Sequence, residues 1–511
     1  MTVDAFYLPP WLSVGTETIV QRFGPAHDSM EYRFPEVTPA AIARWIDGLK
    51  RARAERLLPR SGASIVQVLE RVAERHLDRD DPSRHTAVDL LARSGRFTAP
   101  MIERALDDTF EPLARGGIRK WVESELGSLA ALDRPMPGPD RVARRAHGPE
   151  WMLQIYAGNV PTIPVWPLVS ALLLKAALFA KTSAEEPLFA PLLARTIAEE
   201  DEDLGACMAV VWWKGGTGDL DQAALGVARA VLAFGGEAAT GSIARRARPD
   251  ARLVLHGPKV SVGYVGKRAL TPTAIPKLAE RAALDVALYD QQGCLSPHAY
   301  YVERGGPRAP VDFAVALGKA LHEASTTLPR RRPSHAEAAR VQMVRSHALF
   351  AAASASALPG SAGGAAGEPP LLAPATGTDW TVLTENGARF EPGPTHRVIR
   401  VHSIGGPEEF EAAVAPHARY VEAVALEEEG PRRAVLASRL AALGIPRVAS
   451  LGALQRPSPL DTHGGVQRLL PFVTWTTVDG PAAKRGRPRS SASRSSGGGS
   501  RRASPSRRRS R

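Results

Sequence analysis

Short apolar segments alternate with amphipathic segments between residues 151 and 256, and this alternation limits the fold more than any other feature of the chain. The apolar segments have the length of buried strands, and those between them carry apolar residues at helical spacing. Parallel strands need long crossover connections, so this pattern indicates a parallel sheet with helices on both faces. We predict strands at 151–157, 178–181, 208–213, 230–234 and 253–256, and helices at 168–177, 187–199, 220–229 and 238–246.

The flanking regions have their own patterns. Apolar residues recur at three- and four-residue spacing over 38–130, and Thr38 followed by Pro39 is a typical helix start. Beyond residue 271 the α/β character resumes. There, 282–288 resembles a strand, the Gly/Ala/Pro-rich segment 357–378 indicates a loop, and 469–474 indicates a last strand.

The basic residues are concentrated at the end of the chain. The sequence has 65 Lys and Arg against 53 Asp and Glu, a net charge of +12, and eleven of the basic residues lie in 482–511, which has no acidic residue. This segment is too polar and too charged to fold alone, so we predict a disordered basic tail. Its 484–489 stretch, KRGRPR, is similar to an AT-hook, which suggests a weak nucleic-acid contact, but a solubilising tail is the preferred interpretation.

The remaining composition favours a cytoplasmic protein without a membrane span. Two cysteines exclude a disulfide scaffold. The most apolar segment, 160–180, is interrupted by three prolines and Lys175, so we predict a buried helix leading into a strand.

Cys294 is the first candidate for chemistry. It lies among glycine and polar residues, where a thiol can reach a cleft and act as a nucleophile, although the local sequence alone favours a buried structural cysteine. Cys207 directly precedes an apolar strand and is interpreted as a core residue.

Other candidates lie just after predicted strands, where parallel sheets bind ligands. Asn159 has an amide that can donate to an oxyanion, or can simply support a turn. The glycine-rich turns 214–218 and 234–237 can approach a pyrophosphate, although ordinary strand-to-helix turns explain them equally well. Among the histidines, which show no metal spacing, His463 is a candidate for proton transfer, and His298 is interpreted as a solvated loop residue.

Taken in order, four motifs resemble the aldehyde dehydrogenase superfamily. They are IYAGNVP at 155–161, LFAKTS at 178–183, FGG at 234–236 and QQGC at 291–294, beside the family's P-W-N-F-P, V-V-L-K-P-S-E, F-T-G-S and G-Q-x-C. With THGG at 462–465, the chain is most similar to the acyl-CoA reductase branch, the fatty-acid reductase component of bacterial bioluminescence systems. The resemblance covers about 35–478.

The resemblance implies an aldehyde-dehydrogenase-like α/β fold, with a Rossmann-type cofactor domain and an α/β catalytic domain. The domains expected from it are an N-terminal helical region at 1–130, a cofactor-binding domain at 131–270 with a return segment at 447–481 that includes a possible oligomerisation strand, a catalytic domain at 271–446 with the loop 357–378, and the tail 482–511.

The same resemblance implies a mechanism. Cys294 would attack an acyl-CoA or acyl-protein thioester to form an acyl-enzyme, Asn159 would stabilise the oxyanion, and His463 would transfer a proton. A nicotinamide cofactor would then reduce the thioester to an aldehyde. No metal is expected. The residues expected to bind the cofactor are Lys181, Thr182, Ser183, Gly215, Gly216, Phe234, Gly235 and Gly236.

Two departures from the superfamily refine this expectation. Leu255 stands where hydrolytic members have the Glu of E-L-G-G-K, so water activation would be lost and a reductase is favoured. Ala184 stands where they have the Glu of K-P-S-E, which removes repulsion against a 2′-phosphate that Lys181 can pair with, so NADPH is preferred over NADH, although Glu185 next door weakens this preference.

Three functions therefore remain open. The preferred one is NADPH-dependent reduction of an acyl-CoA thioester, with a fatty-acyl chain, by a homo-oligomer. The second is a CoA-acylating aldehyde dehydrogenase that works in the oxidative direction. The third, of another class, is a non-catalytic scaffold or DNA-associated protein that acts through the tail.

Overall fold

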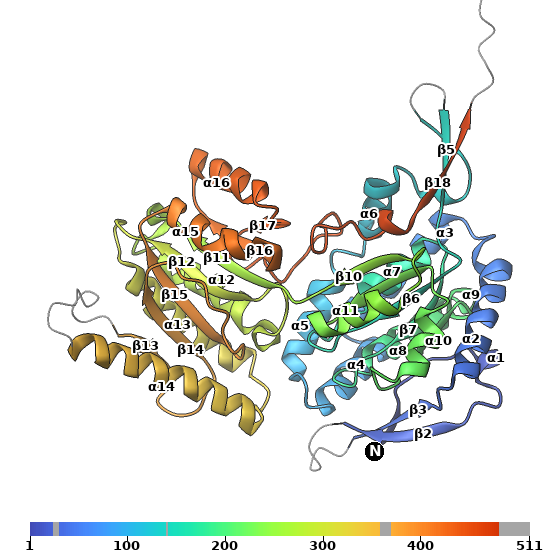
Figure 1. The fold of residues 1–511 in the computed structure, drawn as a ribbon, viewed down its shortest axis with the longest axis horizontal. Helices are drawn as coiled ribbons and strands as arrows, with labels where there is room; N and C mark the ends of the chain where they lie inside the picture. Colours follow the sequence, from blue (N-terminus) through green and yellow to red (C-terminus); the bar gives the residue numbers. More distant parts are fainter. Residues whose placement is uncertain (24–29, 139–141, 358–368, 480–511) are drawn as a thin grey trace, which may run out of the picture.

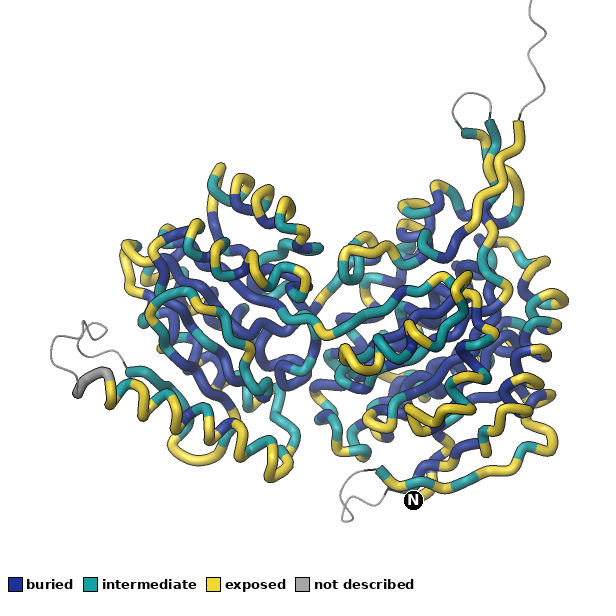
Figure 2. Tube along the Cα trace, in the orientation of Figure 1, coloured by how far each residue is buried: buried dark blue, intermediate teal, exposed yellow. Residues whose placement is uncertain are grey.

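A computed structural model describes residues 1–23, 30–138, 142–357 and 369–479. Two lobes of helices and strands lie side by side, and each is built on its own sheet (Figure 1). The central strands of both sheets are buried, and exposed residues concentrate on the outer helices (Figure 2). The predicted tail 482–511 and most of the predicted loop 357–378 lie outside the described residues.

The first sheet contains the strands predicted from the alternating segment. All its neighbouring strands are parallel, in the order β10-β9-β6-β7-β8. Its strands are β6 (Trp151–Ile155), β7 (Ala177–Lys181), β8 (Met208–Val211), β9 (Ala230–Phe234) and β10 (Arg252–His256), connected through the helices α7 (Val165–Leu173), α8 (Phe189–Glu200), α9 (Glu202–Gly205), α10 (Gly218–Leu225) and α11 (Glu237–Arg246).

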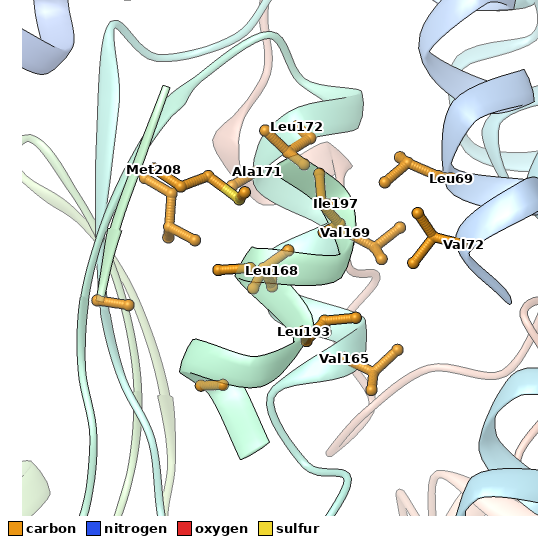
Figure 3. Packing of buried hydrophobic residues seen from close by; sticks show 14 of the residues in the cluster. Leu69, Val72, Val165, Leu168, Val169, Ala171, Leu172, Leu193, Ile197 and Met208 are labelled. Atoms are coloured by element: carbon orange, nitrogen blue, oxygen red, sulfur yellow. The ribbon is translucent and has the colours of Figure 1, made fainter. Parts of the chain in front are cut away.

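Helix α7 explains the most apolar part of the sequence. Its residues are nearly all buried, and Figure 3 shows Leu168, Val169 and Leu172 lying between Met208 of β8 and Leu69 of the helix α3 (Gly62–Leu77). The predicted helix leading into a strand is therefore confirmed, with the helix ending four residues earlier than expected. In the part of the chain that the structure describes, no helix is long and apolar enough to span a membrane.

The helices predicted before the first sheet begin with α2 at residue 39, and only the four-residue helix α1 precedes them. Thr38 begins the helix α2 because its hydroxyl accepts a hydrogen bond from the Ala41 amide at 3.1 Å. Residues 1–35 add a three-stranded sheet that the helical interpretation missed. The elements are β1 (Thr2–Asp4), α1 (Pro10–Ser13), β2 (Thr18–Arg22), β3 (Glu31–Pro35), α2 (Pro39–Ala52), α3 (Gly62–Leu77), α4 (Pro82–Arg93), α5 (Ala99–Phe110) and α6 (Gly117–Leu126).

The second sheet has the order β13-β14-β15-β12-β11-β16-β17, and only the β13–β14 pair is antiparallel. Helices α12 and α13 share one core with it, and the apolar residues of α15 and α16 share another. The strand expected at 282–288 is wrong, because these residues continue α12. The elements are β11 (Val260–Val265), α12 (Ile275–Ala287), β12 (Pro297–Glu303), α13 (Pro310–Thr327), α14 (His335–Ala357), β13 (Leu371–Leu372), β14 (Thr381–Asn386), β15 (Val398–Ile404), α15 (Pro407–Val414), β16 (Val421–Glu427), α16 (Gly430–Ala442) and β17 (Arg447–Ala449).

A second three-stranded sheet extends from the part of the molecule that is built on the first sheet (Figure 1). It has the order β18-β5-β4, with β4 at Met136–Pro137, β5 at Val142–His147 and β18 at Thr474–Asp479. The strand expected at 469–474 is displaced, because residues Leu470–Phe472 form a 3-10 turn around Pro471, which has no N–H to donate to a strand ladder. Whether β18 joins subunits stays a prediction.

Candidate active site

The first and second sheets contribute side chains to one small cavity. Val160, Ile163 and Trp166, which follow β6, line one side, and Cys294 and Glu422 line the other. The cavity has a volume of about 100 Å³. Because the segment after β6 lies at the carboxyl edge of a parallel sheet, the cavity occupies the place where such sheets bind ligands.

The loop that carries Cys294 starts from a left-handed stretch of backbone. Tyr289, Asp290 and Gln291 all have positive φ angles, of 56°, 50° and 64°. Such angles are unfavourable for residues with side chains, and they persist where the surroundings hold them in place. Local sequence gave no sign of this conformation.

A second left-handed stretch, residues 395–397, holds the first one. The His396 amide donates to the Asp290 carbonyl at 2.9 Å, and the Arg397 guanidinium pairs with the Asp290 carboxylate at 2.8 Å. Arg397 and Asp290 are both fully buried. The Gln291 amide bridges strands β12 and β15 by donating to the carbonyls of Pro297 and Val398. These contacts hold the start of the Cys294 loop against strands β12 and β15 of the second sheet.

Cys294 is partly exposed toward the cavity, as expected for a nucleophile. Its carbonyl accepts a hydrogen bond from the Ser261 hydroxyl at 3.0 Å. Burial, followed by the negative charge of Glu422, raises the pKa of the Cys294 thiol to about 12. These surroundings therefore favour the protonated thiol. Cys207 is fully buried, as predicted, and burial also raises its pKa to about 12.

Asn159 lies beside the Cys294 loop. Its side-chain amide donates to the Gln292 carbonyl at 2.9 Å, and its Oδ1 atom is buried without a hydrogen-bond partner. Gly158 is needed here, because a Cβ atom on it would lie 2.6 Å from the Cβ of Glu185. One N–H of the Asn159 amide is thus occupied, and the other remains for the predicted contact with an oxyanion.

His463 lines the same cavity but belongs to a stack of rings. It packs on His256, with ring centroids 4.0 Å apart, and His256 packs on Phe234 at 4.9 Å. Burial and the neighbouring His256 lower the pKa of His463 well below its usual value, so the ring is neutral. Its role in proton transfer stays a prediction. The interpretation of His298 as a solvated loop residue is wrong, since this residue is buried in β12.

The predicted cofactor residues after β7 and β8 come together. The Lys181 ammonium lies 5.3 Å from the centre of the Trp213 ring and 3.9 Å from the position of a Cβ atom on Gly215. Burial lowers the pKa of Lys181 to about 8. The Gly216 amide donates to Asp221 at 3.0 Å, which fixes the turn. Thr182 and Ser183 follow directly, with the Thr182 amide bonded to Val211 and the Ser183 hydroxyl accepting from the Glu185 amide.

The predicted cofactor residues after β9 form a helix start. Gly236 is the N-cap of α11, and a Cβ atom on it would meet no atom within 4 Å. The free amides of a helix N-terminus favour phosphate groups, and the open backbone lets them approach. Together with Lys181, this arrangement fits a dinucleotide, whose nicotinamide would supply hydride chemistry when bound. Leu255 packs against the hydrophobic core on one face of the first sheet and does not line the Cys294 cavity.

Sequence reasoning missed Glu422 and Trp166 as parts of the site. Glu422 is the one charged residue in the first six positions of the strand sequence VEAVALE, and a buried carboxylate in an apolar strand is a signal that could have found it. Trp166 packs edge-to-face against Trp121 and under the Arg468 guanidinium, and no local pattern distinguishes it from a core residue.

Known proteins share this architecture. The chain resembles an NAD-dependent benzaldehyde dehydrogenase from Corynebacterium glutamicum, with a TM-score of 0.65 and 15% identity over 91% of this chain and 95% of that one. It also resembles an NADP-dependent glyceraldehyde-3-phosphate dehydrogenase from Bacillus halodurans C-125, with a TM-score of 0.65 and 14% identity over 91% and 96% of the chains. These likenesses confirm the predicted aldehyde-dehydrogenase-like fold.

Sequence relatives are more specific. A long-chain acyl-protein thioester reductase from Photorhabdus luminescens is 30% identical over 242 residues, which are 47% of this chain and 48% of the relative. One from Vibrio harveyi is 22% identical over 360 residues, or 69% of each chain. The chain thus spans about half the length of the first curated relatives that it matches. The family model for acyl-CoA reductase (LuxC) matches residues 59–475, and the chain therefore belongs to the acyl-CoA reductase (LuxC) family.

Proposed function

We propose that this protein reduces an acyl thioester to an aldehyde through an acyl-enzyme on Cys294. The observation that carries the proposal is the position of this thiol, which faces a cavity between the two sheets with Asn159 beside its loop. The first sheet would hold the cofactor and the second the nucleophile, in keeping with the domains at 131–270 and 271–446. The relatives are named for acyl-protein thioesters, so both acyl-protein and acyl-CoA substrates are proposed.

The residues act as follows in this proposal. The Cys294 sulfur attacks the thioester carbonyl, and the free N–H of the Asn159 amide, together with the Cys294 backbone amide, stabilises the oxyanion. The apolar lining from Val160 and Trp166 excludes water from the acyl group. Leu255 cannot activate water for hydrolysis, so the acyl-enzyme would persist until it is reduced.

NADPH is the proposed reductant. Lys181, at the carboxyl end of β7, would pair with a 2′-phosphate. Glu185 would oppose a phosphate if its charge were free, but it forms an ion pair with Arg96 at 3.0 Å, and Arg96 also donates to Gln292 of the Cys294 loop. The pairing turns the Glu185 charge toward the loop and supports the preference for NADPH over NADH.

The test is incubation with acyl-CoA thioesters of graded chain length and either NADPH or NADH. We expect aldehyde to form, and mass analysis without the reductant to find the acyl group on Cys294. A Cys294→Ala variant should lose both signals, whereas Cys207→Ala should retain both. Rapid oxidation of free aldehyde to acid without CoA, or full reductase activity in Cys294→Ala, would contradict the proposal.

A further inference from the structure

Glu422 is a buried carboxylate that the fold does not explain. It stands in β16, whose residues are otherwise apolar until Glu427, and only 3% of its surface is exposed. Burying a carboxylate is costly unless its oxygens are paired. The Glu422 Oε1 atom accepts a hydrogen bond from the Gly464 amide at 2.7 Å, but Oε2 has no hydrogen-bond partner.

The cations nearest Glu422 are occupied by other groups. Arg447 bonds to Asp461 at 3.0 Å, Arg468 donates to loop carbonyls and packs on Trp166, and the Lys259 ammonium donates to the Arg419 carbonyl at 2.8 Å. No ion pair reaches Glu422 within the described part of the chain. Its second oxygen is therefore left available for a group that enters the cavity.

That cavity is the one that contains the Cys294 thiol. Both side chains line it, with the apolar residues Val160, Ile163 and Trp166 around them. Burial raises the pKa of Glu422 above its usual value, and the Glu422 charge in turn raises the pKa of the Cys294 thiol. The two groups thus interact electrostatically in a small apolar space, each favouring the protonated form of the other.

We propose that Glu422 is the catalytic proton acceptor and donor for acyl transfer to Cys294, an assignment that rests on the proposed function. As the Cys294 sulfur bonds to the thioester carbonyl, its proton moves to the free Oε2 atom of Glu422. When the bond between the carbonyl carbon and the leaving sulfur breaks, Glu422 returns this proton to the departing thiolate. The acyl group is exchanged between two sulfurs, a neutral thiol leaves, and Glu422 ends as it began.

His463 is the competing acceptor in the cavity, and the structure favours Glu422. A general base works best when its pKa lies near the working pH. Burial moves the pKa of Glu422 up toward neutrality and that of His463 far down, away from it. The His463 ring also stacks on His256, whereas the Glu422 oxygen is unoccupied.

The decisive variant is Glu422→Gln, which keeps an acceptor for the Gly464 amide but cannot take up a proton. Glu427→Gln is the matched control, because Glu427 lies on the same strand, also has a buried unpartnered oxygen, and does not line the cavity. Two rates are measured for each protein. One is alkylation of Cys294 by iodoacetamide at pH 9, and the other is single-turnover acylation of Cys294 by acyl-CoA over a range of pH.

The proposal predicts that the two rates change in opposite directions. Without the nearby negative charge the thiol ionises more readily, so alkylation at fixed pH should rise roughly tenfold. Acylation should fall by about 10²- to 10⁴-fold, because the proton acceptor is gone, and the limb of the wild-type pH profile that reports the carboxyl group should disappear. The pH at which this limb appears also depends on the groups that face Glu422. These groups are Cys294, Lys259, Arg447, Arg468 and the turn that contains His463. Glu427→Gln should match the wild type in both rates.

Other results would overturn the assignment. The assignment fails if Glu422→Gln is acylated at a rate within threefold of the wild-type rate, or if its alkylation rate is the same as that of the wild type. It also fails if His463→Asn loses acylation and Glu422→Gln does not. If Glu422→Gln fails to fold, Glu422→Asp keeps the charge but retracts it, and should slow acylation without faster alkylation. If the wild type is not acylated by any thioester, the proposed function fails and the Glu422 role with it, whereas wild-type acylation with an unaffected Glu422→Gln refutes only the latter.

Discussion

Replacing Arg397 by Met tests whether the buried ion pair holds the Cys294 loop. Arg397 and Asp290 have 0% and 1% of their side chains exposed. The guanidinium places Nε and Nη2 at 3.0 and 2.8 Å from the Asp290 Oδ1 atom, and Nη2 also donates to the Leu328 carbonyl at 2.8 Å. Removing one partner of a buried pair leaves the other charge uncompensated, so we expect the variant to lose about 3–5 kcal/mol of stability.

The loss of stability in this variant should depend on pH, and the raised pKa of Asp290 sets the direction of that dependence. Burial already raises the pKa of Asp290 above its usual value, although Arg397 opposes this effect. Without Arg397 the folded-state pKa rises further, while the unfolded value does not change. The folded variant then binds a proton that the unfolded chain does not, so its stability falls as pH rises through the interval between the two pKa values. The deficit should be greater at pH 8 than at pH 5.

Urea unfolding followed by tryptophan fluorescence at both pH values measures this deficit. The double variant Asp290→Asn, Arg397→Met is the control, because it leaves no charge uncompensated and should lose less stability than the sum of the single changes. A deficit below about 1 kcal/mol for Arg397→Met, or one that is equal at pH 5 and pH 8, would refute the reasoning.

Three further predictions concern the site. Lys181→Met should raise the KM for NADPH in steady-state kinetics by about tenfold and the KM for NADH by less. The wild-type preference for NADPH should weaken as pH rises above about 8, where the Lys181 amine loses its proton. Equal effects of Lys181→Met on both cofactors would contradict this role. Asn159→Ala should slow single-turnover acylation by about 10²- to 10³-fold, and an unchanged rate would exclude it as an oxyanion donor. Peptide mapping after alkylation of the native protein should find label on Cys294 and not on the fully buried Cys207.

The alternating part of the fold was predictable because its signal is local. A buried parallel strand is a short apolar run between helices, so β9 was predicted at its observed bounds, Ala230–Phe234, and the others within a few residues. Residues 282–288 show the limit of this signal. The run is apolar in either conformation, and only its packing in α12, with Ala282, Ala283 and Val286 in the core of the second sheet, makes it helical.

The candidate site was predictable where a motif stays in one segment. Cys294, Asn159, Lys181 and the glycines after β9 were found because each follows a strand or resembles a family motif. The contacts between distant segments were not predictable. The Asp290–Arg397 pair joins residues 107 positions apart, and the approach of Glu422 to the Cys294 cavity depends on how β16 lies beside β11.

The raised pKa of Cys294 explains why a proton acceptor matters in this site. With its pKa raised by burial and by the Glu422 charge, the thiol strongly favours its protonated form at neutral pH. Many reactive cysteines are instead kept as thiolates by nearby cations or a helix N-terminus, and they react with any electrophile. Here burial and then the Glu422 charge favour the protonated thiol, so in this proposal the sulfur reacts slowly until a thioester occupies the cavity and its proton has a place to go. Such an arrangement would slow alkylation of the nucleophile without preventing it, and it would make reactivity depend on the bound substrate rather than on a standing thiolate.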